Sequence, residues 1–153
     1  MALEVLVEDP STSEITELLE IHLAFMRSIS PPESVHALDV EALRAPEITF
    51  WTVRDEGHLL GCGALKELNE GHGEIKSMHS REAARGKGVA QKLLDHLFEE
   101  ARSRGYRRLS LETGNTAHFF PAHRLYQRNG FGPSPPFANY REDPHSIFMT
   151  REL

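Results

Sequence analysis

The sequence predicts a single α/β (α+β) domain over residues 1–153, built on a mixed, mostly antiparallel sheet. A length of 153 residues suits one hydrophobic core. Strand-like segments separated by short turns lie between residues 48 and 79, and an antiparallel meander is their most economical arrangement. Between residues 74 and 112 a strand, a loop, an amphipathic helix and another strand follow one another, as in a right-handed crossover.

The first third of the chain is predicted to hold one strand and two helices. Apolar and polar residues alternate over residues 2–8, which is typical of a half-buried strand. Apolar residues recur at helical spacing from residue 15 and predict a helix to about residue 27. The prolines at 31–32 end this helix, and a short second helix is expected over residues 38–44.

The central meander is indicated by segments rich in β-branched and aromatic residues. Turns are expected at residues 55–57 and 69–73 because both stretches carry glycine next to polar residues. Gly61 and Gly63 stand inside the second strand and indicate a bulge there. The three strands are predicted over residues 48–53, 58–68 and 74–79.

The second half of the chain is predicted to alternate helices and strands. The helix after the loop has two apolar rows at i, i+4 spacing and a charged opposite face, and Gly105 is expected to cap its end. A strand over residues 106–112 and a helix over 118–129, starting near Pro121, follow. A last strand is expected over residues 146–150.

Composition and charge narrow the class of protein. Hydrophobic residues make up 39% and charged residues 26% of the chain, no apolar run is long enough to span a membrane, and the N-terminus lacks a signal-peptide pattern. Cys62 is the single cysteine, so no intrachain disulfide can form. We therefore expect a cytoplasmic protein. A formal net charge of −6 argues against nucleic acid as a partner, because its phosphates would be repelled.

The loop between the predicted strand 74–79 and the following helix carries most of the functional information. Gly86 and Gly88 allow the backbone to approach a ligand closely, and Arg81, Arg85 and Lys87 add positive charge. The amides of a helix's first turn have no intrahelical partner, and the helix dipole is positive there. This loop is therefore expected to bind an anionic group.

Three kinds of phosphate loop share parts of this pattern. A Walker loop requires Ser or Thr after its Gly-Lys pair, which is missing here. A dinucleotide fingerprint requires a third small residue where Gln91 stands, and an acidic residue about 20 positions on, for which Glu112 comes late. The pattern Arg/Gln-x-x-Gly-x-Gly/Ala is matched in full by residues 85–90. In this loop the chain resembles the GNAT superfamily of N-acetyltransferases.

A second motif strengthens the resemblance. Residues 125–131 match the Leu-Tyr-x-x-x-Gly-Phe segment common in that superfamily, and the similarity in order of elements covers roughly residues 3–151. The resemblance implies helices on both faces of the central sheet, and a splay between its fourth and fifth strands that receives the pantetheine arm of acetyl-CoA.

The resemblance also implies which residues contact acetyl-CoA, the expected co-substrate. The main chain of Met78 and Ser80 would bind the pantetheine amides, since splayed strands leave backbone groups without ladder partners. Family members often have an asparagine seven residues before the motif tyrosine, where this chain has Phe119, so Asn115 is the candidate for that contact. The pyrophosphate would lie on the amides of Arg85, Gly86, Lys87, Gly88, Val89 and Ala90.

The chemistry implied is direct attack of an amine on the thioester in a ternary complex. Tyr126 is expected to protonate the departing thiolate. Glu74 resembles the base of several family members, with His79 and His72 as rivals because histidine has the better suited pKa. Cys62 is expected to be buried and inert rather than a covalent carrier. The alternative is an acyl-CoA-binding regulatory domain without turnover; nucleotide binding at the same loop is a third possibility.

The acceptor is expected to be a primary amine of a small molecule or peptide, bound near the first helices and the late strands. No metal site is expected, because the nine histidines are scattered without ligand spacing. A homodimer is possible, since dimers are frequent in the superfamily. The candidate residues for the acceptor site are His22, Phe25, Arg27, Glu33, His36 and Tyr140.

Overall fold

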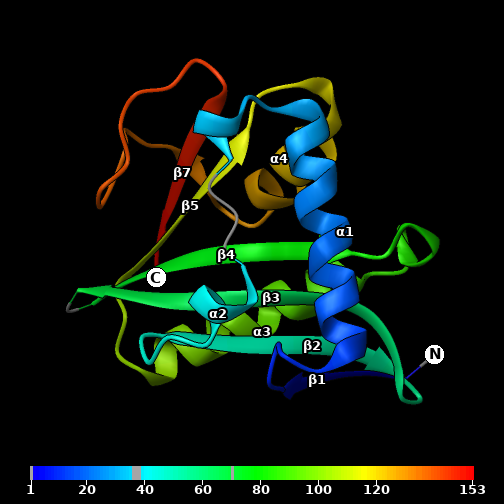
Figure 1. The fold of residues 1–153 in the computed structure, drawn as a ribbon. Coiled ribbons are helices and arrows are strands. Elements are labelled where there is room, and N and C mark those ends of the chain that lie inside the picture. The colour runs from blue at the N-terminus through cyan, green and yellow to red at the C-terminus, as the bar shows by residue number, and fades with distance from the viewer. Residues whose placement is uncertain (1, 36–38, 70) are drawn as a thin grey trace.

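A computed structural model describes residues 2–35, 39–69 and 71–153. Figure 1 shows their arrangement around one sheet. The strands are β1 (Leu3–Val7), β2 (Ile48–Asp55), β3 (His58–Asn69), β4 (His72–Ser80), β5 (Arg108–Gly114), β6 (Gly132–Pro133) and β7 (Ser146–Glu152). The helices are α1 (Ser13–Ile29), α2 (Val40–Leu43), α3 (Val89–Ser103) and α4 (Phe120–Arg128), with 3-10 turns η1 (Pro32–Ser34), η2 (Glu82–Ala84) and η3 (Ala117–Phe119). Within the part of the chain described, no helix is long and apolar enough to cross a membrane.

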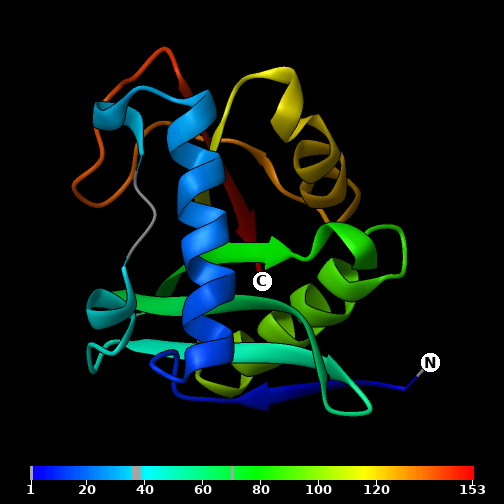
Figure 2. The same cartoon turned by 45° about the vertical axis from the view of Figure 1, so that its right-hand side comes forward.

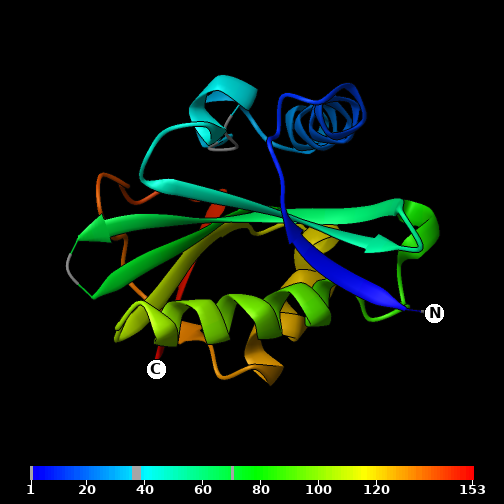
Figure 3. The ribbon, with the colours of Figure 1, turned by 90° about the horizontal axis from the view of Figure 1, so that it is seen from below.

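The sheet has the order β1-β2-β3-β4-β5-β7-β6 and carries helices on both faces. Seen from below, α1 and α2 cover one face and α3 and α4 the other (Figure 3). Each face has its own core. Buried side chains of α1, α2, β2 and β3 form one cluster, whereas those of α3, α4 and the other face of the strands form a larger one. The predicted mixed sheet with helices on both faces is therefore confirmed.

The predicted elements are present, with shifted ends. β4 begins at His72 rather than Glu74, because the preceding turn is tighter than the pattern indicated. β5 begins at Arg108 rather than residue 106, since the Tyr106 amide still donates to Ala101 O at the end of α3, at 2.9 Å. β6 is too short to leave a periodic signal and was not predicted.

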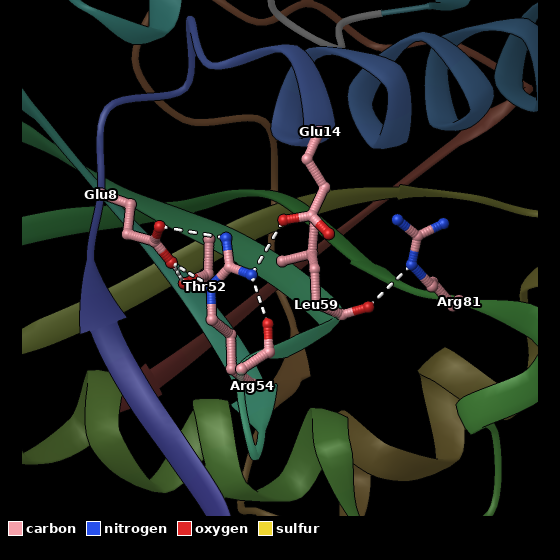
Figure 4. Close-up of polar contacts among 7 residues, drawn as sticks. Glu8, Glu14, Thr52, Arg54, Leu59 and Arg81 are labelled. Carbon is pink, nitrogen blue, oxygen red and sulfur yellow. Dashed lines mark hydrogen bonds and ion pairs between the residues drawn. The ribbon is translucent and has the colours of Figure 1, made fainter.

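Arg54 connects the beginning of the chain to the meander. Its guanidinium donates to Glu8 at 2.7 and 3.1 Å, to Glu14 at 2.9 Å and to the carbonyl of Gly57 at 2.8 Å (Figure 4). The hydroxyl of Thr52 also donates to Glu8. These contacts join the end of β1, the start of α1 and the β2–β3 turn, so they fix how α1 enters its path across the sheet.

The sheet opens between β4 and β5, its one parallel pair among the described strands. Pairing runs from His72 and Arg108 to Glu74 and Ser110 and stops there, although both strands continue. Figure 1 shows β4 and β5 diverging beyond this point. The predicted splay between the fourth and fifth strands is thus confirmed, and it leaves backbone groups of both strands available for a ligand.

Candidate active site

The predicted phosphate loop forms an open turn at the start of α3. β4 leads directly into it (Figure 2). Gly86 and Gly88 have φ of +78° and +79°, and a side chain at either position would meet no atom within 4 Å, so their conformation is set by the turn and not by crowding. Because the first intrahelical bond runs from Lys92 N to Gly88 O, the amides of residues 88–91 precede the helix ladder.

The loop amides are not all equivalent. Arg85 N donates to Glu82 O at 3.2 Å and Lys87 N donates to Ala84 O at 3.3 Å, so both close the η2 turn. The remaining amides of the predicted set belong to Gly86, Gly88, Val89 and Ala90. Arg85 and Lys87 are exposed and place positive charge around these amides.

A bulge interrupts β4 as it leaves β5. In the β3–β4 register, Cys62 lies opposite His79 and Ala64 opposite Lys76, so β4 contains one extra residue. Ser77 has φ of +55° within this bulge, and its buried hydroxyl has no hydrogen-bond partner among the described residues. The bulge expected inside β3 lies at Leu60, next to Gly61, where Val53 and Arg54 of β2 pair with Gly61 and Leu59. Opposite Gly63 the extra residue belongs to β4 instead, next to the splay.

A cleft of about 120 Å³ lies in the splay. It is closed on one side by α1, through His22 and Met26, and on the other by α4. The sequence-predicted residues Glu74, Met78 and Tyr126 all line it. The full lining is His22, Met26, Glu74, Ile75, Lys76, Ser77, Met78, Leu111, Glu112, Thr113, Phe119, Ala122, Tyr126 and Tyr140.

Tyr126 is placed in the cleft by the apolar packing of α4. Its ring meets Phe131 edge-on with centroids 5.6 Å apart, and its hydroxyl lies 3.8 Å from Met78 Sδ. Burial raises the pKa of this hydroxyl to about 12. The phenol is therefore protonated at neutral pH and can donate a hydrogen bond or a proton to a group that enters the cleft.

A polar triad of buried Glu74 and partly buried Lys76 and Tyr140 divides the cleft from a second cavity. Lys76 Nζ lies 3.0 Å from Glu74 Oε2, and the Tyr140 hydroxyl donates to the same oxygen at 2.5 Å. Lys76 Nζ is also 2.9 Å from the Tyr140 hydroxyl. Burial, followed by the charge of Glu74, raises the pKa of Tyr140, which stays protonated. All three side chains line both cavities.

The second cavity has a volume of about 380 Å³ and is open to solvent on the side of the segment before β7. It contains one of the residues predicted for the acceptor, Glu33, besides Tyr140. Its full lining is Glu33, Lys66, Glu74, Lys76, Ala138, Asn139, Tyr140, Arg141, Glu142 and Asp143.

Glu112 is a cleft residue that the sequence analysis did not propose for catalysis. Burial raises its pKa to about 7, while a hydrogen bond from the Ser146 hydroxyl at 2.8 Å opposes that rise. Lys76 was missed as well. A weak signal existed for both, because strand alternation places Lys76 on the face of Glu74 and Glu112 on the face of Ser110. Only the splay, however, turns these two faces into one cleft.

The histidines proposed as rival bases occupy other environments. His79 Nδ1 lies 3.1 Å from His22 Nδ1 of α1, and burial lowers both pKa values to about 4. His72 is buried at the start of β4, although the sequence predicted a turn over residues 69–73, because β4 begins earlier. Its Nε2 lies 2.7 Å from Ser110 Oγ, and it does not line either cavity.

The remaining predicted residues lie at different distances from the cleft. Ser80 ends β4 just before the loop, outside the lining of the cleft. Asn115 is exposed, and its side chain donates to the carbonyl of Pro144, whereas Phe119 lines the cleft. Cys62 is buried as expected, and burial raises the pKa of its thiol to about 12, so it is inert.

The residues of α1 that were predicted for the acceptor site lie in different environments. His22 reaches the cleft, Phe25 packs against His118 with ring centroids 6.0 Å apart, and Arg27 is exposed. His36 lies outside the described residues. Within the described parts of the chain, no three His, Cys, Asp or Glu side chains are grouped to hold a metal ion.

An open β4–β5 splay with a basic glycine loop at its end is the arrangement of an acyl-CoA-dependent N-acyltransferase. The chain belongs to the acetyltransferase (GNAT) family, whose model matches residues 15–131. By this membership the protein is an acyl-CoA-dependent N-acetyltransferase, as the loop and the Leu-Tyr motif predicted.

Individual relatives agree with this assignment. The uncharacterized N-acetyltransferase YsnE of Bacillus subtilis is 51% identical over 99% of this chain and all of its own length. The IAA acetyltransferase of Azospirillum brasilense is 36% identical over 95% of each chain. Among solved structures, a putative acyl-CoA N-acyltransferase from Klebsiella pneumoniae superposes with a TM-score of 0.82 at 30% identity, covering 99% of this chain and 97% of its own. A GNAT family acetyltransferase from Elizabethkingia anophelis with acetyl-CoA bound superposes with a TM-score of 0.71 at 20% identity, covering 99% and 98%.

Proposed function

We propose that the protein transfers an acetyl group from acetyl-CoA to a primary amine of a small molecule or peptide, by direct attack in a ternary complex. The observation that carries this proposal is the cleft between β4 and β5, with Tyr126 in its wall. A structure of the same fold with acetyl-CoA bound supports the choice of acyl donor.

The residues present fit acetyl-CoA. The amides of Gly86, Gly88, Val89 and Ala90 would hold the pyrophosphate, helped by the exposed side chains of Arg85 and Lys87. The main chain of Met78 and Ser80 would pair with the pantetheine amides, as β4 has no partner strand there on the side of β5. The buried and unpartnered hydroxyl of Ser77 supplies a further polar group beside that path. Asn115 remains a candidate for a contact outside the cleft.

Catalysis would use the two sequence-predicted side chains in the cleft. The bound thioester supplies an electrophilic carbonyl carbon and a sulfur leaving group. Tyr126 would donate its proton to that sulfur as the carbon–sulfur bond breaks. Glu74 would act on the acceptor site indirectly, because it lines both cavities and holds Lys76 and Tyr140 in the wall between them.

Charge favours a cationic acceptor. The lining of the two cavities is predominantly acidic, so an ammonium group would be attracted and a free carboxylate repelled. The acidic side chains are Glu33, Glu74, Glu112, Glu142 and Asp143, against the basic side chains of Lys66, Lys76 and Arg141. Amino acids, polyamines, aminoglycosides and peptide N-termini would be screened for release of CoA thiol. The charge of the lining predicts that polyamines and aminoglycosides react better than amino acids, whose carboxylate lies beside the amine.

The proposed acetyl-CoA site is tested with two glycine variants that impose the same backbone strain. Gly88 and Gly105 both have φ of +79°, and a side chain added at either position would meet no atom within 4 Å. Alanine in this conformation costs about 1–2 kcal/mol, and both variants should lose similar stability. We expect Gly88→Ala to weaken CoA binding about tenfold by calorimetry, and Gly105→Ala to leave it unchanged. An absence of heat from the wild type at millimolar CoA would refute the proposal.

A further inference from the structure

We infer that Glu112 is the group that accepts the proton of the acceptor amine, an inference that rests on the acetyl transfer proposed above. Glu112 lies on β5 two residues beyond Ser110, where the ladder with β4 ends. It is therefore among the first side chains of β5 to enter the splay. It lines the same cleft as Tyr126, the proposed proton donor. The group that gives up a proton and the group that takes one would therefore lie in the walls of the same cleft.

One hydrogen bond orients the carboxylate of Glu112 and leaves its second oxygen able to accept another. The Ser146 hydroxyl donates to Oε2 at 2.8 Å, from the first residue of β7. No other hydrogen bond or ion pair to this carboxylate is present within the described structure. One oxygen thus fixes the side chain, and the other is available to an incoming ammonium group.

The surroundings of Glu112 favour a proton at neutral pH. Partial burial has the largest effect and raises its pKa to about 7. Of the groups around it, Glu74 on β4 and Asp143 in the loop before β7 raise the pKa, and Lys76 on β4 lowers it. The other titratable groups of the cleft are His22, Tyr126 and Tyr140, which are neutral at pH 7. A base with this affinity can take a proton and release it again at neutral pH.

The contacts of Glu74 suit it less well for this step. Its Oε2 already holds Lys76 Nζ at 3.0 Å and the Tyr140 hydroxyl at 2.5 Å, and its side chain is 3% exposed. A carboxylate in such an ion pair gives up those bonds when it is protonated. Glu74 is better described as the residue that positions Lys76 and Tyr140 in the wall between the two cavities.

The protons and bonds of the reaction balance with these assignments. Glu112 takes one proton from the ammonium group, and the neutral nitrogen forms a bond to the thioester carbonyl carbon. The carbon–sulfur bond breaks, and the sulfur leaves with the proton of Tyr126. The second nitrogen proton, lost as the amide forms, restores the Tyr126 hydroxyl. Glu112 then releases its proton to solvent, so that each turnover yields one amide, one thiol and one proton.

The test compares the pH dependence of kcat/KM for the wild type, Glu112→Gln and Glu74→Gln, with the amine that reacts best in the screen. Wild-type kcat/KM should rise with pH through about 7 and level off. Glu112→Gln should lose this inflection and about 100-fold of its rate at pH 7, with CoA affinity unchanged. Glu67→Gln is the matched control, an exposed carboxylate on β3 outside both cavities.

Other outcomes overturn the inference. An inflection near pH 7 that persists in Glu112→Gln excludes Glu112 as the proton acceptor, and its loss in Glu74→Gln alone assigns the step to Glu74. If the wild type acetylates no amine but binds CoA, the proposed function itself fails. A ¹³C NMR titration of glutamate carboxyl groups tests Glu112 without turnover. It should show one signal that titrates near pH 7 and is missing in Glu112→Gln; a Glu112 signal titrating at the ordinary value contradicts the inference.

Discussion

At the scale of single residues, the hydroxyl of Tyr126 makes few contacts within the protein itself. Its ring is buried against Phe131, but its oxygen contacts only a thioether, Met78 Sδ, at 3.8 Å among the described residues. A sulfur is a weak acceptor, so removal of the hydroxyl should cost little stability. The oxygen is thus retained at a position where folding barely requires it, and where a leaving thiolate would need a proton.

Tyr126→Phe should separate catalysis from binding. We expect kcat to fall about 100-fold, because the thiolate loses its proton donor, while CoA affinity and unfolding free energy stay near wild-type values. Tyr106→Phe is the matched control, since Tyr106 is similarly buried but lies outside the cleft. Steady-state kinetics and calorimetry supply the measurements. An unchanged kcat in Tyr126→Phe would show that Tyr126 is not the proton donor for the leaving thiolate.

At the scale of elements, Arg54 determines how β1 and α1 attach to the sheet. Its side chain is 16% exposed and binds two carboxylates and a carbonyl, whereas Arg44 makes its ion pairs with Asp9 and Glu41 at 48% exposure. Partly buried charged hydrogen bonds contribute more to stability than exposed pairs, which are screened by solvent.

We therefore expect Arg54→Met to lower the unfolding free energy by about 1–3 kcal/mol, and Arg44→Met by less than about 1 kcal/mol. Arg54→Lys should lie close to Arg54→Met, because an ammonium cannot reproduce the fork that binds Glu8 through two nitrogens. Urea denaturation measures all three. Equal losses from Arg54→Met and Arg44→Met would show that the cluster in Figure 4 does not anchor α1.

Elements were more predictable than their spatial relations. The apolar rows of α3 and the alternation in β2 and β3 are local patterns, and both appear as expected. The splay, by contrast, is a missing interaction between β4 and β5, and local periodicity cannot report it; only the motif resemblance predicted it. The pairing of Lys76 with Tyr140 across 64 positions also has no local signal. For the same reason Glu112 looked like an ordinary strand residue.

At the scale of the whole molecule, two partly buried sites make opposite contributions to the free energy of unfolding as pH changes. His22 and His79 hold pKa values of about 4, lowered by burial from the usual 6.5. The unfolded chain therefore binds protons first, and this pair's contribution is present above pH 6.5 and lost as pH falls toward 4. Glu112 behaves in the reverse sense. Its raised pKa favours the folded state at low pH, and that contribution is lost as pH rises from about 4.5 through 7.

The two contributions overlap between pH 4.5 and 6.5, where each conceals part of the other, so variants are needed to separate them. Replacing His22 and His79 together by Gln should weaken the loss of unfolding free energy below about pH 6.5, because neutral amides can still bond between α1 and β4.

Glu112→Gln should raise stability at about pH 8 and leave it little changed at about pH 4.5, since it removes a carboxylate that burial disfavours when ionised. Urea denaturation at pH intervals across this range measures both slopes. A Glu112→Gln protein less stable than wild type at the alkaline end would show that the Ser146 bond to the ionised carboxylate outweighs its desolvation, and would remove the physical basis for a raised proton affinity in the cleft.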